Sequence, residues 1–168
     1  MSLEPKGDFD RTDLVFGSGA RIRGEDIIFV SSGTTVDRLH KISIGEKTYI
    51  SNTLPGLLAH LDLPATLRGY TEAVNAIVGG IDQDNPVFYA GSEKVELLYF
   101  YNWIWSDNTI RRGNKPFASR QFNNYNEYIR FLEGSIKCIT LNAKAPARKT
   151  KYRLLGSISS GYDSATAS

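Results

Sequence analysis

The sequence is poor in cysteine and histidine, with one Cys and two His among its 168 residues. Because a single cysteine cannot pair within the chain, a framework of intrachain disulfides is excluded, and Cys138 fits a reducing compartment. His40 and His60 have no Cys or His partner at metal-ligand spacing, so no metal site is indicated. Cys138 falls inside an apolar helical pattern, where we expect it to pack rather than to react.

Long hydrophobic runs and a strong excess of one charge are also missing. No apolar stretch approaches the ~20 residues that cross a membrane. The first residues, Met1–Lys6, have no apolar segment that would serve as a signal peptide. The net charge of +2 gives no general signature of nucleic-acid or membrane binding. We therefore expect a cytoplasmic protein with neither a nucleic acid nor a membrane as partner, and we leave a homodimer open.

Several familiar catalytic patterns are absent as well. The Gly-Ser-Gly of segment 17–19 lacks a third glycine at Ile22 and a following Gly-Lys, so we predict a turn and not a nucleotide loop. The segment 156–160 places Ile158 where a nucleophile elbow has its serine. Paired carboxylates for acid–base chemistry are not identifiable, so the catalytic residues stay unknown.

The sequence does contain a series of short segments typical of antiparallel β-strands. Leu39–Ile44 has the alternation of a strand, and Gly45–Lys47 predicts a hairpin with a second strand over Thr48–Asn52. Val95–Trp105 is the longest apolar stretch and predicts one strand. We expect its five aromatic residues in a sandwich core with one half-exposed face, rather than in base stacking or carbohydrate binding. Further short strands are predicted at 14–16, 21–23, 27–30 and 109–112, and a turn at Ser106–Asn108 joins the last of them to Val95–Trp105 as a second hairpin.

Three segments have the 3.6-residue period of amphipathic helices. The first covers Leu54–Leu61. The second covers Leu67–Val78 and ends at two glycines. The third follows Asn124, which can cap it together with Glu127, and it keeps its apolar stripe to Ala143.

The end of the sequence holds its most specific pattern. An apolar run of strand length, 152–158, leads into Ser159-Ser160-Gly161-Tyr162-Asp163-Ser164, and residues 165–168 could open a helix. Free backbone N–H groups at such a junction favour an anion, and glycine lets the backbone approach a phosphate closely. The simpler interpretation is a strand-to-helix turn with a polar corner. A basic segment, 144–153, precedes the loop and is either solvated surface or an electrostatic support for the anion.

The hexapeptide 159–164 resembles the Ser-Gly-Gly-x-Asp-Ser pyrophosphate loop of the N-type ATP pyrophosphatases, most closely that of the asparagine synthetase branch. Five of six positions match, and Ser160 stands where the first glycine is usual. The order of elements from about Asp37 onward also resembles the middle of an asparagine synthetase.

This resemblance implies an α+β fold in three parts. A flexible leader, 1–13, precedes a shortened, glutaminase-like (N-terminal-nucleophile hydrolase-like) domain at 14–120, with an antiparallel sheet and helices. The segment 121–168 then supplies a bridging helix and the first strand and ATP loop of an α/β ATP-pyrophosphatase domain.

The same resemblance implies the N-terminal portion of an ATP-dependent, AMP-forming ligase, which adenylates a carboxylate and passes it to an amine. Its cofactors would be ATP and Mg²⁺. Asp163 would place the Mg²⁺, and the sequence ends four residues after Ser164, so we expect the chain alone to be inactive. The pyrophosphate would be held by Ser159, Ser160, Gly161, Tyr162, Asp163 and Ser164.

One departure from the family bears directly on function. Its glutaminases use a cysteine at the mature N-terminus as the nucleophile, whereas Ser2 stands at position 2 here. We therefore expect no glutaminase activity. The alternative function is a non-catalytic binding or assembly domain in which the terminal Ser/Gly loop is only structural.

Overall fold

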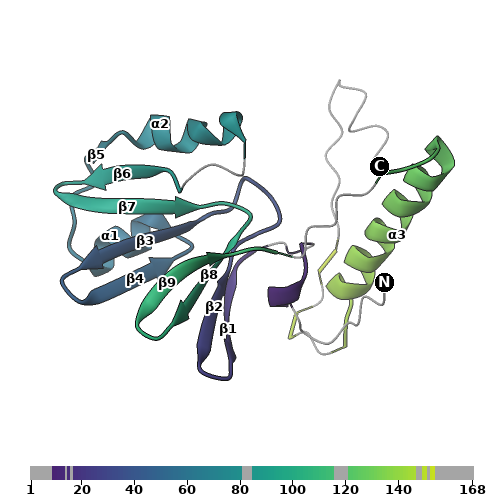
Figure 1. The fold of residues 1–168 in the computed structure, drawn as a ribbon, viewed down its shortest axis with the longest axis horizontal. Helices are drawn as coiled ribbons and strands as arrows, with labels where there is room; N and C mark the ends of the chain where they lie inside the picture. The colour runs from purple at the N-terminus through teal and green to yellow at the C-terminus, as the bar shows by residue number, and fades with distance from the viewer. Residues whose placement is uncertain are drawn as a thin grey trace. The chain divides into compact units, whose positions relative to one another are not determined.

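The computed structural model describes residues 9–13, 15, 17–80, 85–115, 121–146, 149–150 and 152–153. These residues divide between two compact units, Phe9–Ala118 and Ser119–Ser168. They form a mixed α+β protein with two antiparallel sheets and three α-helices (Figure 1), which confirms the predicted class. Both sheets belong to the first unit, and the longest helix belongs to the second.

The strands of the first unit build a four-stranded sheet of order β1-β2-β8-β9 and a five-stranded sheet of order β4-β3-β7-β6-β5. Every neighbouring pair is antiparallel. The strands are β1 (Gly19–Arg23), β2 (Asp26–Val30), β3 (Leu39–Ile44), β4 (Lys47–Ser51), β5 (Leu67–Arg68), β6 (Val87–Ala90), β7 (Glu93–Leu98), β8 (Asn102–Ser106) and β9 (Thr109–Gly113). The helices of this unit are α1 (Leu54–His60), α2 (Tyr70–Asn75) and the 3₁₀ helices η1 (Phe9–Arg11) and η2 (Ala76–Gly79).

Both faces of the five-stranded sheet are packed. Neighbouring residues of a strand point to opposite faces, and this divides the apolar residues of β3 and β7 between two cores. Ile42 and Leu97 pack with side chains of α1 and α2, whereas Leu39 and Leu98 pack with Trp103 of β8. The first unit is therefore layered as helices, five-stranded sheet and four-stranded sheet (Figure 1).

Two predicted hairpins are confirmed. The turn between β3 and β4 contains Gly45 at a φ of +58°, a conformation that glycine adopts without steric cost. The turn between β8 and β9 holds Asp107 at φ +48° and Asn108 at φ +58°. Two successive left-handed residues form a type I′ turn, whose twist matches that of the flanking strands. The strands predicted at 21–23 and 27–30 are β1 and β2, whereas 14–16 lies mostly outside the described residues.

The prediction of one strand over Val95–Trp105 is wrong. The segment is divided between β7 and β8, which belong to different sheets. Between them Phe100 has a φ of +63°, and the N–H of Tyr101 donates to the carbonyl oxygen of Tyr99 at 2.6 Å, which together make a γ-turn. An apolar run of this length exceeds the usual strand of about 5–6 residues. By turning once, it contributes side chains to both cores.

The second predicted helix is shorter than its apolar pattern. Leu67–Arg68 forms β5, which pairs with β6. Gly69 then takes a left-handed φ of +76°, and α2 begins only at the next residue. The α-helix ends at Asn75 and continues as η2 to Gly79. The apolar period therefore runs across a strand, a glycine turn and two kinds of helix.

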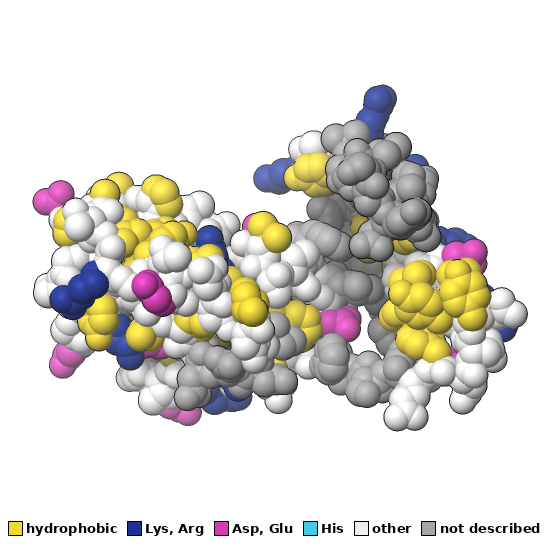
Figure 2. All heavy atoms as spheres, turned by 90° about the horizontal axis from the view of Figure 1, so that it is seen from above, with side chains coloured by type: hydrophobic (Ala, Val, Ile, Leu, Met, Phe, Trp, Pro, Cys, Tyr) yellow, Lys and Arg dark blue, Asp and Glu magenta, His cyan; other side chains and the backbone are white. Residues whose placement is uncertain are grey.

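In the second unit, α3 (Tyr125–Ala143) begins where the capping residues predict. The N–H of Glu127 donates to Oδ1 of Asn124 at 3.0 Å, and Oε2 of Glu127 accepts from the N–H of Asn123 at 2.8 Å. Much of the apolar stripe stays exposed, and Figure 2 shows hydrophobic side chains gathered over α3. The exposed apolar residues of this helix are Tyr125, Tyr128, Phe131, Leu132, Ile136 and Leu141.

None of the helices in the described part of the chain combines the length and apolarity that a membrane span requires. On the face of the first unit visible in Figure 2, side chains of both charges are interspersed among neutral ones. That face offers no broad field of one sign.

Candidate functional site

The residues that the sequence singles out for ATP and Mg²⁺ lie outside the described residues. These are Ser159, Ser160, Gly161, Tyr162, Asp163 and Ser164. The structure does describe how the chain leaves α3 on the way to them. The N–H of Lys144 donates to the carbonyl oxygen of Thr140 at 3.2 Å, and the N–H of Tyr152 donates to that of Ala143 at 3.1 Å. The first residue of the apolar run is thus fastened to the C-terminal end of the helix, where carbonyl groups need partners.

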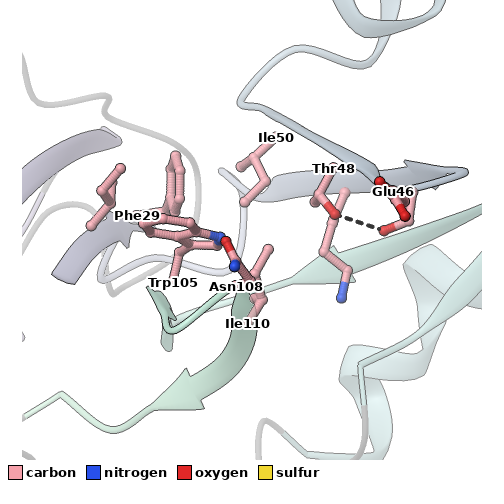
Figure 3. Close-up of a pocket in the computed structure, with 10 residues that line it drawn as sticks. Phe29, Glu46, Thr48, Ile50, Trp105, Asn108 and Ile110 are labelled. Carbon is pink, nitrogen blue, oxygen red and sulfur yellow. Dashed lines mark hydrogen bonds between the residues drawn. The ribbon is translucent and has the colours of Figure 1, made fainter. Parts of the chain in front are cut away.

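A groove of about 860 Å³ opens between the two sheets of the first unit (Figure 3). It lies between β2, β8 and β9 on one side and the β3–β4 hairpin on the other. Its volume falls within the range of roughly 300–1,000 Å³ that is usual for small-molecule sites.

One wall of the groove is apolar. Ile27, Phe29, Trp105 and Ile110 line it, and all four are half-buried. Trp105 is paired in register with Ile27 on one neighbouring strand and with Ile110 on the other, so these three side chains form a row on one face. Ile50 of β4 faces this row across the groove (Figure 3).

Apart from Ile50, the opposite wall is polar. The hydroxyl oxygens of Ser43 and Thr48 are 3.1 Å apart in a hydrogen bond, and both residues are exposed. Nζ of Lys41 lies 2.9 Å from Oε2 of Glu96 and 5.4 Å from the centroid of the Trp103 ring. The ammonium group is therefore already paired with a carboxylate at the polar wall.

The groups in this groove are suited to binding rather than to bond cleavage. The hydroxyls of Ser43 and Thr48 bond to each other, not to a histidine or another base that would activate them. Among the residues that the structure describes, no three His, Cys, Asp or Glu side chains gather as metal ligands. The walls match a ligand with one apolar face and one polar edge.

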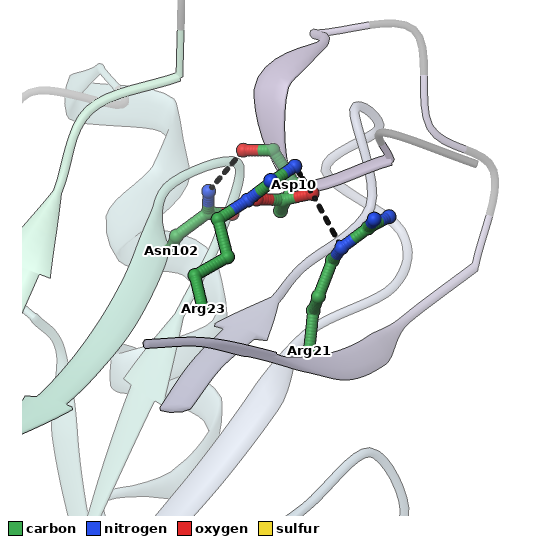
Figure 4. A network of polar contacts seen from close by, with 4 residues as sticks. All are labelled: Asp10, Arg21, Arg23 and Asn102. Carbon is green, nitrogen blue, oxygen red and sulfur yellow. Dashed lines mark hydrogen bonds and ion pairs between the residues drawn. The ribbon is translucent and has the colours of Figure 1, made fainter. Parts of the chain in front are cut away.

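A second polar site holds η1 against the four-stranded sheet (Figure 4). The Asp10 carboxylate, which is 6% exposed, accepts hydrogen bonds from Nε and Nη2 of Arg23, and it lies 3.6 Å from Nε of Arg21. Nδ2 of Asn102 donates to the Asp10 carbonyl oxygen at 3.2 Å. Burial alone would raise the pKa of Asp10, but the hydrogen bonds and the two arginine charges hold the pKa below its ordinary value of 3.8.

A third site is a buried amine at the end of the first unit. Nζ of Lys115, a residue that is 3% exposed, donates to the carbonyl oxygen of Ser31 and lies 5.5 Å from the centroid of the Phe100 ring. Burial lowers the pKa of Lys115 to about 8, and the charge of Asp13 opposes this in part. The ammonium ties the end of β9 to the buried loop after β2 and is closed to a ligand.

Comparisons of the chain with models of protein families, with curated proteins and with solved structures found no match.

The polar sites and the groove were not predicted from the sequence. The alternation of β3 places Lys41 and Ser43 on one face, and that of β4 places Thr48 and Ile50 together. This alternation is the signal that one face of the hairpin is partly polar. The facing wall depends on Trp105, which the prediction of a single strand had assigned to the same sheet as the hairpin. The sequence therefore indicates the β3–β4 wall of the groove but not the wall that contains Trp105.

Proposed function

We propose that this chain is the N-terminal portion of an ATP-dependent, AMP-forming ligase of the asparagine synthetase type. The observation that carries the proposal is the hexapeptide 159–164, with its Ser-x-Gly-x-Asp-Ser pattern, directly after an apolar run of strand length. The position of Tyr152 at the C-terminal end of α3 supports it, because a long helix then leads into the run.

In this proposal the first unit is a shortened glutaminase-like domain without hydrolytic function. Its two antiparallel sheets and helical layer support such a scaffold. The single cysteine of the sequence, Cys138, belongs to α3 and not to the first unit. The hydroxyls of the groove also lack an activating base.

The ligase chemistry would take place at the terminal loop. Backbone N–H groups around Gly161 and the hydroxyls of Ser159, Ser160 and Ser164 would hold the β- and γ-phosphates of ATP. Asp163 would position Mg²⁺, which together with the N–H groups stabilises the charge on the departing pyrophosphate. The substrates are a carboxylate that becomes adenylated and an amine that accepts it.

Isotope exchange between pyrophosphate and ATP tests the proposal. The protein encoded by the complete reading frame should catalyse carboxylate-dependent exchange with Mg²⁺. Gly161→Ala and Asp163→Asn should each reduce the exchange at least 100-fold, because the backbone can no longer approach the phosphates or the metal loses its carboxylate. Asp107→Asn, in the β8–β9 turn of the first unit, is the matched control and should keep the activity. Exchange that survives Asp163→Asn would refute the role of the loop.

The absence of glutaminase function is tested on the same preparation. Incubation with glutamine should release no glutamate above the uncatalysed background. Glutamate release that Ser2→Ala abolishes would show that the protein is a working glutaminase, with serine in place of the usual cysteine.

The groove between the sheets favours a second candidate function, a non-catalytic binding domain. It has the size and mixed polarity of a ligand site without a nucleophile–base pair. Under this candidate the loop 159–164 is only a turn, so pyrophosphate exchange is absent. A ligand would then change the fluorescence of Trp105, and Trp105→Phe would remove that response.

A further inference from the structure

Arg38 directly precedes β3, and two tyrosine side chains hold its guanidinium group. Nη1 of Arg38 donates to the Tyr99 hydroxyl oxygen at 3.0 Å, and Nη2 donates to that of Tyr70 at 3.3 Å. The central carbon of the guanidinium group lies 5.8 Å from the centroid of the Tyr99 ring and 5.9 Å from that of Tyr70. Two aromatic rings therefore hold the guanidinium in a fixed position.

The register of the sheet explains this arrangement. Leu39 of β3 is paired with Leu98 of β7, so Arg38 before it and Tyr99 after its partner lie opposite each other. Tyr70 is the first residue of α2 and packs on the same core, edge to face with Phe88. Tyr99 is 5% exposed, whereas Arg38 and Tyr70 are half-buried, so the guanidinium is reached from solvent on one side.

The charge of Arg38 is not neutralised by a paired carboxylate among the described residues. In the described part of the chain it forms no ion pair, in contrast to Arg23, which pairs with Asp10, and Lys41, which pairs with Glu96. Its two phenol partners are neutral. A partly buried cation is stabilised when an anion supplies the missing charge.

Hydrogen-bond donors remain in excess at this point. A guanidinium has five N–H groups, of which the two phenols take two. Each phenol oxygen accepts from Arg38, so its own O–H is left to donate elsewhere. Three N–H groups and two O–H groups thus gather around one positive charge, without an acceptor of matching charge among the described residues.

A neighbouring imidazole strengthens the case without joining the site. His40 follows Arg38 on the same face of β3 and is buried, and its Nδ1–H donates to the carbonyl oxygen of Ser51 at 3.4 Å. Its Nε2 has no partner in the described structure. His40 is therefore neutral, and Arg38 alone provides the cation on this face.

We propose that Arg38, Tyr70 and Tyr99 form a binding site for an oxyanion, carried by a carboxylate or a phosphoryl group. The guanidinium supplies charge and planar N–H donors, and the two phenols supply O–H donors from either side. The site lies in the first unit and does not depend on the ligase function, because none of its residues belongs to the terminal loop.

Two-dimensional NMR of the ¹⁵N-labelled chain tests the site directly. The chain is titrated with sodium phosphate in one arm and sodium acetate in the other, at pH 7 and at an ionic strength held constant with sodium chloride. The Nε–Hε signal of Arg38 and the backbone signals of Tyr70 and Tyr99 should shift and saturate in the millimolar range. Saturation by phosphate alone identifies a phosphoryl group, and saturation by acetate identifies a carboxylate.

Variants separate this site from general attraction of anions. Arg38→Gln should weaken binding at least tenfold, because it removes the charge and most of the donors. Arg111→Gln, an exposed arginine on β9, changes the net charge equally and should leave binding unaltered. Tyr70→Phe keeps the ring and removes one O–H, so it should weaken binding severalfold even if Arg38→Gln perturbs the fold. Absence of saturable shifts with both anions, or equal binding by wild type and Tyr70→Phe, would overturn the proposal.

Discussion

His40 is a neutral imidazole enclosed in the core beneath the helices, and this makes the first unit sensitive to mild acid. Burial above all lowers the pKa of His40 to about 4, with the charge of Arg38 acting in the same direction and the hydrogen bond to Ser51 against both. The ordinary pKa of 6.5 applies in the unfolded chain. Unfolding therefore takes up a proton between about pH 6.5 and pH 4, and stability falls as the pH falls through this window.

The pKa difference corresponds to a loss of about 3 kcal/mol between pH 7 and pH 4. In urea denaturation at a series of pH values, His40→Leu should remove most of this dependence, since position 40 then has no group that gains a proton on unfolding. His60→Gln, on the surface of α1, is the control and should retain the wild-type profile. A His40→Leu profile as steep as that of the wild type would assign the acid sensitivity to other groups.

The burial of single polar residues, and the partners that they find, are the features of the structure that the sequence predicts least well. Asp10 stands in a polar leader, and nothing in the local pattern marks it as 6% exposed. Its partners, Arg21 and Arg23, lie on a strand, and only tertiary packing brings the three together. The same holds for Lys115 and Ser31, which are far apart in sequence and meet through the paired strands β2, β8 and β9.

The turn between β8 and β9 offers a test at the level of one element. Asn108 has a φ of +58°, a conformation in which glycine carries no penalty and residues other than Asn or Asp are strained. Asn108→Gly should raise the free energy of unfolding by about 0.5 kcal/mol, whereas Asn108→Val should lower it by 1–2 kcal/mol, roughly the cost of a left-handed residue.

Thr109→Gly is the matched control for that pair, because it places glycine in the adjoining strand. It should destabilise the protein by about 0.5–1 kcal/mol. Urea denaturation followed by tryptophan fluorescence reports all three variants. If Asn108→Gly and Thr109→Gly both destabilise, the turn is not of the left-handed type.

Elements with a local sequence signal were predicted well, whereas elements that end at an unexpected turn within an apolar run were not. The β3–β4 hairpin has its glycine turn, and α3 has its Asn–Glu cap, so both were recognised. The turn at Phe100 between β7 and β8 has no such sequence signal, since a bulky aromatic residue rarely takes a positive φ. β6 is four residues long and was not predicted, because its period is too short to stand out.

At the level of the whole molecule, we expect the first unit to fold alone. Both apolar cores are built from its own residues, from Phe29 to Ile110. We expect a fragment spanning Phe9–Ala118 to give a dispersed NMR spectrum and a thermal midpoint within about 5 °C of the whole chain, since about 1 kcal/mol corresponds to 4–8 °C in a domain of this size. An unfolded fragment would mean that the second unit contributes essential contacts.

The candidate groove is likewise a property of the whole unit, because its walls come from two sheets. The hairpin that contains Trp105 and Ile110 was predicted, but nothing in the sequence places these two residues opposite Thr48 and Ile50. That contact follows from the turn at Phe100, which sends β8 into the second sheet. The sequence thus predicts the hairpins and leaves their stacking undetermined.

The pairing of β2 with β8 also governs the order in which the molecule can assemble. The hairpins β1–β2 and β8–β9 each close over a two-residue turn, which is fast. Joining them requires Ile28 to pair with Ile104, and all five strands of the other sheet lie between these two residues in the sequence. A high proportion of distant contacts slows folding. We expect the four-stranded sheet to be completed last, so that newly made chains pass through a state in which Trp103 and Phe29 are still in water and open to association with other chains.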